Sequence, residues 1–133
     1  MNTRQLREDD WETLQNWWSA WPEWPNMPKD MLPENGTGGL MVEKNGVPVV
    51  AGFIYLSNSK VAFLEWVISN PDYREDDRNK IIKTLITKSE DLVRGLGYKA
   101  LFSFTQHKKL IEIHKELGWL IDKEPSYELT KIL

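Results

Sequence analysis

Few side chains in this sequence of 133 residues can transfer protons near neutral pH, because it has two histidines and no cysteine. The absence of cysteine excludes disulfides, thiolate metal sites and cysteine nucleophiles, and we expect no metal site. His114 lies on the apolar face of an expected helix. Its imidazolium can donate a proton near neutral pH, but a single histidine on such a face is more often a hydrogen-bonded packing residue. His107 stands at the start of the same helix, where capping is the favoured role.

A carboxylate within an apolar strand is the second candidate for proton transfer. Glu65 stands between Leu64 and Trp66 in the sequence. Strand alternation places its side chain on the face of Phe63 and Val67, which favours a partly buried glutamate with a raised pKa. The alternative is a solvent-facing carboxylate without a chemical role.

A charged run occupies residues 74–80, with the sequence Arg-Glu-Asp-Asp-Arg-Asn-Lys. Its three acids, Glu75 to Asp77, would repel a bound anion, because two like unit charges about 4 Å apart repel by about 1 kcal/mol even in water. The flanking Arg74, Arg78 and Lys80 could instead pair with phosphate oxygens while the acids cap a helix. The alternative is an acidic helical turn that binds no ligand.

Tryptophans are concentrated before and within a proline-rich stretch, at Trp17, Trp18, Trp21 and Trp24. Indole faces attract cations, so an amine, an ammonium group or a flat aromatic molecule is a suitable ligand. Trp17 and Trp18 are equally well explained as helix-face residues that anchor a helix to a sheet. Trp21 and Trp24, on the loop, are therefore the candidates for contact with a ligand or a protein partner.

The elements that must position these residues follow from hydrophobic periodicity and turn signals. In the first half we expect a strand over residues 3–7, a helix from Asp9 or Asp10 to Trp21, and an irregular loop up to Gly39 that its prolines stiffen. Alternating apolar residues then predict three antiparallel strands over residues 39–44, 47–56 and 61–69. Asn45-Gly46 is a strong turn signal between the first two of these strands.

The second half alternates helices and strands. We expect a helix over residues 78–94 ended by Gly95, a strand over 97–105, a helix over 107–117 ended by Gly118, and a closing hairpin of residues 119–122 and 127–133. The order β-α-loop-β-β-β-α-β-α-β-β predicts an α/β fold with a mixed sheet covered by helices. At this length, residues 1–133 fit a single domain.

The overall charge limits the partners. The formal net charge is -3, which argues against a nucleic acid or an anionic membrane held by bulk electrostatics. The sequence shows no signal-peptide core and no apolar run of the roughly 18–20 residues that a membrane helix needs. We therefore expect a cytoplasmic protein with no nucleic-acid or membrane partner.

Two stretches carry a resemblance to a known family. The first, Glu65 to Arg74, reads EWVISNPDYR and is similar to the fourth strand and the following loop of the GNAT N-acetyltransferase superfamily. The second, Leu110 to Trp119, reads LIEIHKELGW and is similar to that family's last helix. The order of elements also resembles this superfamily over nearly the whole chain. The resemblance implies a GNAT-like fold with a splayed mixed sheet.

The resemblance also implies a cofactor, acetyl-coenzyme A. In the family, a loop of the form Arg/Gln-x-x-Gly-x-Gly/Ala opens a helix whose backbone N–H groups bind the pyrophosphate, while the pantetheine arm runs along the fourth strand. In this chain Asp77 and Asn79 replace the two glycines. The cofactor-binding residues that the resemblance implies are Val67, Ser69, Arg74, Asp77, Arg78, Asn79 and Lys80.

The implied function is an acetyl-coenzyme-A-dependent N-acetyltransferase that transfers the acetyl group directly to a small-molecule or protein amine in a ternary complex. Glu65 occupies the place of the family's general base. His114 occupies the place of a tyrosine that protonates the departing thiolate. Trp21 and Trp24 lie where the family forms one wall of the acceptor site. The protein would act as a monomer or a homodimer.

A second hypothesis is a GNAT-fold binding or structural protein that has lost the cofactor. Short members with eroded glycine loops are similar to some bacteriophage-encoded proteins, including internal virion proteins, and such a protein would work in the host cytoplasm. The loop at residues 74–80 separates the two hypotheses. Its missing glycines favour loss of the cofactor, whereas the strand before it and the last helix favour retention.

Overall fold

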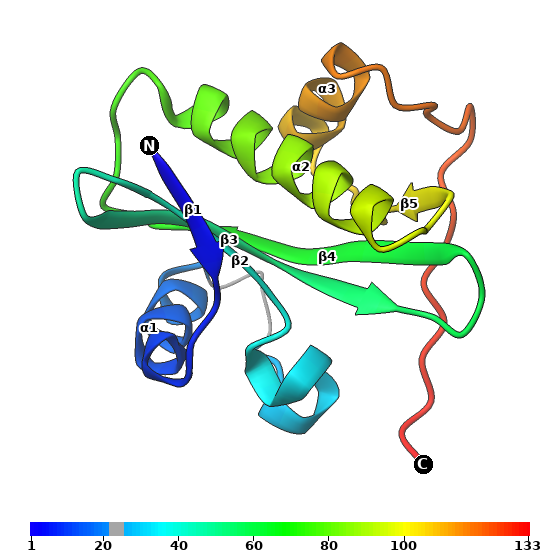
Figure 1. Ribbon diagram of the computed structural model, residues 1–133, viewed down its shortest axis with the longest axis horizontal. Coiled ribbons are helices and arrows are strands. Elements are labelled where there is room, and N and C mark those ends of the chain that lie inside the picture. Colours follow the sequence, from blue (N-terminus) through cyan, green and yellow to red (C-terminus); the bar gives the residue numbers. More distant parts are fainter. Residues whose placement is uncertain (22–25) are drawn as a thin grey trace.

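A five-stranded mixed sheet forms the centre of the described structure (Figure 1). The sequence predicts a mixed sheet, but one with the two strands of the closing hairpin in addition. The computed structural model describes residues 1–21 and 26–133. The strands lie in the order β1 (Asn2–Gln5), β2 (Gly39–Lys44), β3 (Val47–Leu56), β4 (Val61–Ser69) and β5 (Ala100–Phe102). Neighbouring strands are antiparallel except for β4 and β5, which are parallel. The parallel pair therefore lies at one edge of the sheet.

Helices cover both faces of this sheet (Figure 1). On one face lie α2 (Arg78–Gly95) and α3 (Lys108–Glu116); on the other lie α1 (Trp11–Ala20) and the short 3-10 turns η2 (Lys29–Met31) and η3 (Pro33–Gly36). None of the helices in the described parts of the chain is both long and apolar enough to span a membrane. The two layers divide the core into separate apolar clusters on the two faces of the sheet.

Tryptophans fix the first helix to the sheet. Trp17 and Trp18 are 5% and 1% exposed. The Trp18 ring stacks on Phe53 of β3, with centroids 6.2 Å apart and planes 15° apart. Full burial of an aromatic side chain is among the largest single contributions to a core. The anchoring interpretation of Trp17 and Trp18 is confirmed.

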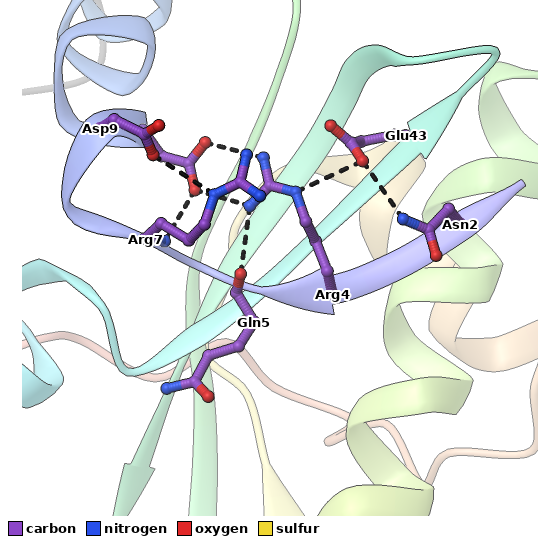
Figure 2. Close-up of polar contacts among 7 residues, drawn as sticks. Asn2, Arg4, Gln5, Arg7, Asp9 and Glu43 are labelled. Carbon is purple, nitrogen blue, oxygen red and sulfur yellow. Dashed lines mark hydrogen bonds and ion pairs between the residues drawn. The ribbon is translucent and has the colours of Figure 1, made fainter.

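A partly buried ion pair ties the first strand to the start of the first helix (Figure 2). Both carboxylate oxygens of Asp10, at the end of the 3-10 turn η1 (Glu8–Asp10), accept hydrogen bonds of 2.8 Å from the Arg4 guanidinium. The backbone N–H of Arg7 donates to the same carboxylate at 2.8 Å. Arg4 also reaches Glu43 of β2 at 3.3 Å. Asp10 thus connects β1 and α1 instead of capping α1 with its side chain.

The predicted closing hairpin is wrong. Residues 120–133 form no helix or strand, and nearly all their large apolar side chains are highly exposed, with Leu120, Leu129 and Leu133 at 100%, 91% and 110%. The edge that such a hairpin would extend is short, since β5 pairs with β4 over three residues instead of the nine expected for residues 97–105. Beyond it, the N–H of Phe104 donates to the Glu65 side chain at 2.9 Å. The backbone N–H of Phe104 therefore bonds to a side chain and not to a further strand.

Candidate active site

Two parallel strands separate beside a bulge, and this junction forms the centre of the candidate site. The pairing of β4 with β5 ends at Phe63 and Phe102. On the other side of β4, Phe53 pairs with Glu65 and Ala51 with Ile68, so one residue of β3 faces two of β4. Bulges of this kind often lie next to active sites, because they redirect side chains.

Glu65 lies at this junction and is partly buried. Burial raises its pKa to about 7; the hydrogen bond from the Phe104 N–H offsets part of this, and the negative charge of Glu128 adds to it. The expectation of a partly buried glutamate with a raised pKa is confirmed. Glu65 shares the face of Phe63, as predicted, but Val67 packs in the clusters on the α2 face. The bulge interrupts the alternation from which that part of the prediction came.

The N-terminus of α2 follows β4 and offers free backbone donors. The N–H of Arg78 bonds to the carbonyl of Glu75 at 3.3 Å, and that of Ile81 to the carbonyl of Asp77 at 3.0 Å. Among the described residues, the N–H groups of Asn79 and Lys80 have no backbone acceptor. Such free donors, together with the dipole of an 18-residue helix, favour a bound anion.

The first replaced glycine, Asp77, turns its carboxylate away from these donors. One oxygen is paired with the Lys44 ammonium at the end of β2, and the other accepts the Tyr73 hydroxyl at 2.7 Å. The Lys44 ammonium is the largest influence that lowers the pKa of Asp77, and the Tyr73 hydroxyl adds to it. Of the three acids in the run, only Glu75 and Asp76 are exposed and unpaired in the described structure.

One arginine begins α2, and another lies in the loop before it. The Arg78 guanidinium bonds to the hydroxyl of Ser69 at the end of β4 and lies 5.8 Å from the centre of the Trp21 ring. Burial lowers the pKa of Arg78, and the positive charge of Arg74 lowers it further. Arg74 itself is exposed and donates to the carbonyl of Pro71 at 3.3 Å.

These residues fit the pyrophosphate of coenzyme A. The site combines two free backbone N–H groups, two arginines and a carboxylate that Lys44 neutralises, and an anion needs this balance of charge. The predicted cofactor residues divide into two groups. Ser69, Arg74, Asp77, Arg78, Asn79 and Lys80 gather around the N-terminus of α2, while the Val67 side chain packs against α2 in the core.

The two histidines have different environments. His107 caps α3, since its Nδ1 accepts the N–H of Leu110 at 3.3 Å, and the capping prediction is confirmed. His114 is 3% exposed, its Nδ1 lies 2.8 Å from the carbonyl of Leu110, and its Nε2 is buried with no partner among the described residues. Its ring meets Trp119 edge-on at 4.6 Å. Burial lowers its pKa. This environment favours the packing role; proton donation by His114 stays a prediction.

The tryptophan candidates are placed only in part. Trp21 is partly buried, and its indole N–H donates to the carbonyl of Ser69 at 3.2 Å. Its ring lies beside Arg78, so it contacts the end of β4 near the predicted cofactor residues. Trp24 lies outside the described residues.

Sequence reasoning missed Lys44, Tyr73, Tyr55 and Glu128. Lys44 lies 33 residues from its partner Asp77, and only the Asn45-Gly46 turn beside it was readable from the sequence. Tyr73 is four residues before Asp77, a helical spacing that falls in a loop. Glu128 lies in the segment expected to form the closing hairpin.

Comparison with known proteins agrees with this fold. A family model described as the acetyltransferase (GNAT) family matches residues 3–119. Because this model matches most of the chain, the chain belongs to the acetyltransferase (GNAT) family. Comparison with curated protein sequences gave no match.

Several solved structures share the fold at low sequence identity. An aminoglycoside acetyltransferase, meta-AAC0020 from an uncultured soil metagenomic sample, has a TM-score of 0.70 at 12% identity, covering 99% of this chain and 96% of that one. The ribosomal-protein-S18-alanine N-acetyltransferase from Escherichia coli has a TM-score of 0.70 at 15% identity, over 88% and 76%. AAC(6')-Iy in complex with a bisubstrate analogue has a TM-score of 0.68 at 17% identity, over 98% of both chains.

Proposed function

We propose that this protein is an acetyl-coenzyme-A-dependent N-acetyltransferase that acts on an amine by direct transfer in a ternary complex. The observation that carries the proposal is Glu65, a partly buried carboxylate with a pKa of about 7, at the place where β4 and β5 separate. A base with a pKa near the working pH is suited to removing a proton from an ammonium group.

The N-terminus of α2 is the proposed anchor for the cofactor. The free N–H groups of Asn79 and Lys80 would bind the pyrophosphate oxygens, with Arg74 and Arg78 beside them. Lys44 reduces the repulsion that Asp77 would otherwise cause. Val67 and Ser69 would contact the pantetheine arm through the backbone of β4.

The chemistry then needs little more than positioning and one proton acceptor. Bound acetyl-coenzyme A supplies a thioester whose carbonyl carbon an unprotonated amine can attack. Glu65 would take the proton from the amine, directly or through water. His114 is retained as a proposed proton donor to the leaving thiolate, in a minor role, because its Nδ1 is bonded within α3 and its Nε2 is buried.

The acceptor is proposed to be a small-molecule or protein amine. The solved relatives include aminoglycoside acetyltransferases, one in complex with sisomicin, and a ribosomal-protein alanine N-acetyltransferase. Trp21 and Trp24 are proposed to contribute an aromatic wall that favours a cationic acceptor. The proposed place of action is the cytoplasm, or the host cytoplasm for a phage-encoded protein.

One observation favours a second candidate function, a binding protein without cofactor. Glu75 and Asp76 place two exposed carboxylates immediately before α2. They would weaken the binding of a pyrophosphate, and in this reading the fold serves only as a scaffold.

Calorimetry with acetyl-coenzyme A separates the two candidates. We expect micromolar binding to the wild type and weaker binding to Arg74→Ala, with no change in Arg94→Ala, an exposed arginine at the far end of α2 that pairs with Asp91. Ligand at 100 times its Kd should add about 2.7 kcal/mol to the free energy of unfolding. Absence of heat and of any thermal shift at millimolar ligand would eliminate the enzyme.

Transfer is tested with two acceptors taken from the relatives, sisomicin and a peptide with an N-terminal alanine. Release of free coenzyme A thiol that depends on the acceptor supports the transferase. Tight cofactor binding with neither acceptor active would leave the acceptor class to be found among other amines.

A further inference from the structure

The bulge in β4 places an aromatic residue in an unusual backbone conformation. Trp66 has a φ of 55°. Large side chains rarely adopt this left-handed region, and they do so where the surrounding structure holds them. On β3, Gly52 lies opposite the bulge, and a Cβ there would come within 3.0 Å of Leu64 and 3.2 Å of Leu85. The glycine leaves room for these two side chains on the α2 face of the sheet.

The bulge determines which side chains share the face of the candidate site. Glu65 pairs with Phe53, whose side chain lies in the core cluster under α1, and Trp66 packs against that same cluster. In a regular strand, consecutive side chains would point to opposite faces. The bulge therefore puts Trp66 on the same face as Glu65, the residue that precedes it in the strand.

A short chain of hydrogen bonds holds Trp66 in this conformation. The indole N–H of Trp66 donates to the hydroxyl of Tyr55 at 3.0 Å, and that hydroxyl donates to the carbonyl of Met31 at 3.0 Å. Tyr55 is on β3 and Met31 ends the turn η2, so the chain links the bulge to a neighbouring strand and to the loop layer. Burial raises the pKa of Tyr55, which keeps its hydroxyl protonated and able to donate.

We propose that Tyr55 is a positioning residue, which holds the Trp66 bulge and thereby the Glu65 carboxylate at the junction of β4 and β5. Tyr55 acts through Trp66, and we assign it no contact with the reacting atoms. One hydroxyl satisfies an indole donor and uses a backbone acceptor, a pairing that phenylalanine cannot replace. This inference rests on the proposed role of Glu65 as the base.

Tyr55→Phe keeps the ring and removes the hydroxyl. We expect kcat to fall about tenfold, the effect of one lost hydrogen bond of ordinary strength. The acidic limb of the pH profile should shift, because the surroundings of Glu65 change. The KM for acetyl-coenzyme A should change little, because α2 is untouched. The matched control is Tyr98→Phe, which loses a similar 3.0 Å bond to the carbonyl of Ser57 at a distance from the site.

A readout independent of activity separates this inference from the proposed function. In protein labelled with 15N-tryptophan, the indole proton of Trp66, assigned through Trp66→Phe, should move upfield and exchange faster with solvent in Tyr55→Phe. If the indole signal shifts in Tyr55→Phe but Glu65→Gln is fully active, the bond between Trp66 and Tyr55 exists but Glu65 is not the base. The positioning role would then be overturned. An unchanged indole signal, or an unchanged pH profile in an active enzyme, would overturn it directly.

A second single variant, Trp66→Phe, covers the case in which Tyr55→Phe does not fold. Trp66→Phe removes the donor and leaves Tyr55 intact, and it should move the pH profile in the same direction. Where both variants fold, Tyr55→Phe combined with Trp66→Phe should cost no more than one of them, because the two act through one bond. Additive losses, or a Trp66→Phe profile identical to that of the wild type, would overturn the proposal.

Discussion

Glu65 sits in a setting that raises its affinity for a proton. Its neighbours on the same face are aromatic: Phe63 stacks on Phe104 at 6.1 Å, and Tyr55 carries the hydroxyl bonded to Trp66. Burial disfavours the charged carboxylate, and in the described part of the chain only the backbone N–H of Phe104 compensates for it. A carboxylate in this environment can hold and release a proton near neutral pH.

The pH dependence of catalysis tests Glu65 directly. A general base must be deprotonated, so the rate should rise with pH through the Glu65 pKa of about 7. Glu65→Gln should lose this limb and lower kcat by roughly 10²–10⁴-fold, with the affinity for acetyl-coenzyme A preserved. The matched control is Glu90→Gln, a partly buried carboxylate that accepts the indole N–H of Trp119 at 3.3 Å. A wild-type limb that persists in Glu65→Gln would assign the base to another group.

The surroundings of Glu65 could be predicted from the sequence only in part. Alternation with Phe63 indicated its face correctly. No residue type in the stretch Glu-Trp-Val-Ile indicates a backbone in the left-handed region, where glycine or asparagine is usual. The bulge lies opposite Gly52, and its Trp66 bonds to Tyr55 of the neighbouring strand, so it belongs to the tertiary structure.

At the level of elements, the loop before α2 depends on a contact with the β2–β3 hairpin. Lys44 stands immediately before the Asn45-Gly46 turn, and its ammonium holds the Asp77 carboxylate away from the helix N-terminus. The helix dipole and the free N–H groups can then act on an anion without the Asp77 carboxylate among them. The affinity for the cofactor should therefore depend on a residue of the hairpin.

A double-mutant cycle tests this dependence. Lys44→Met leaves the Asp77 carboxylate without its cation, and we expect weaker binding of acetyl-coenzyme A. Asp77→Asn in the same protein should restore binding, because it removes the repelling charge and keeps a side chain that can accept from Tyr73. Calorimetry gives the four affinities. The control is Lys88→Met, which replaces an exposed lysine on α2. Equal affinities for the wild type and Lys44→Met would show that this ion pair does not influence the site.

The elements themselves were predictable where periodicity and turns agreed. The bounds of β2, β3 and β4 coincide with those expected from alternation, and a strong turn signal joins β2 and β3. The closing hairpin failed although Tyr127 and Leu129 alternate as in a strand. A strand needs a partner edge, and the edge at β5 is only three residues long. Alternation reports a local preference and cannot supply that partner.

At the scale of the whole molecule, the titrations of Glu65 and His114 change the free energy of unfolding in opposite directions as the pH changes. The pKa of Glu65 is raised in the folded state. Its contribution to the free energy of unfolding is therefore fully present below about pH 4.5 and is lost as the pH rises to about 7. His114 has a pKa lowered by burial from 6.5, so folding is disfavoured as the pH falls below 6.5. The two groups lie in separate layers, since Glu65 faces the α1 side of the sheet and His114 packs within α3 next to Trp119.

These opposite slopes can be separated by substitution. In Glu65→Gln the loss between about pH 4.5 and about pH 7 should disappear, so the free energy of unfolding should increase with pH up to 6.5 and then level. In His114→Phe the acid-side loss should disappear, and the free energy of unfolding should decrease steadily as the pH rises toward 7. Urea unfolding at intervals across this range gives the slopes, which are insensitive to a constant packing loss from either substitution. Curves parallel to that of the wild type would show that the substituted group titrates alike in the folded and unfolded chains, and the environment assigned to it would be wrong.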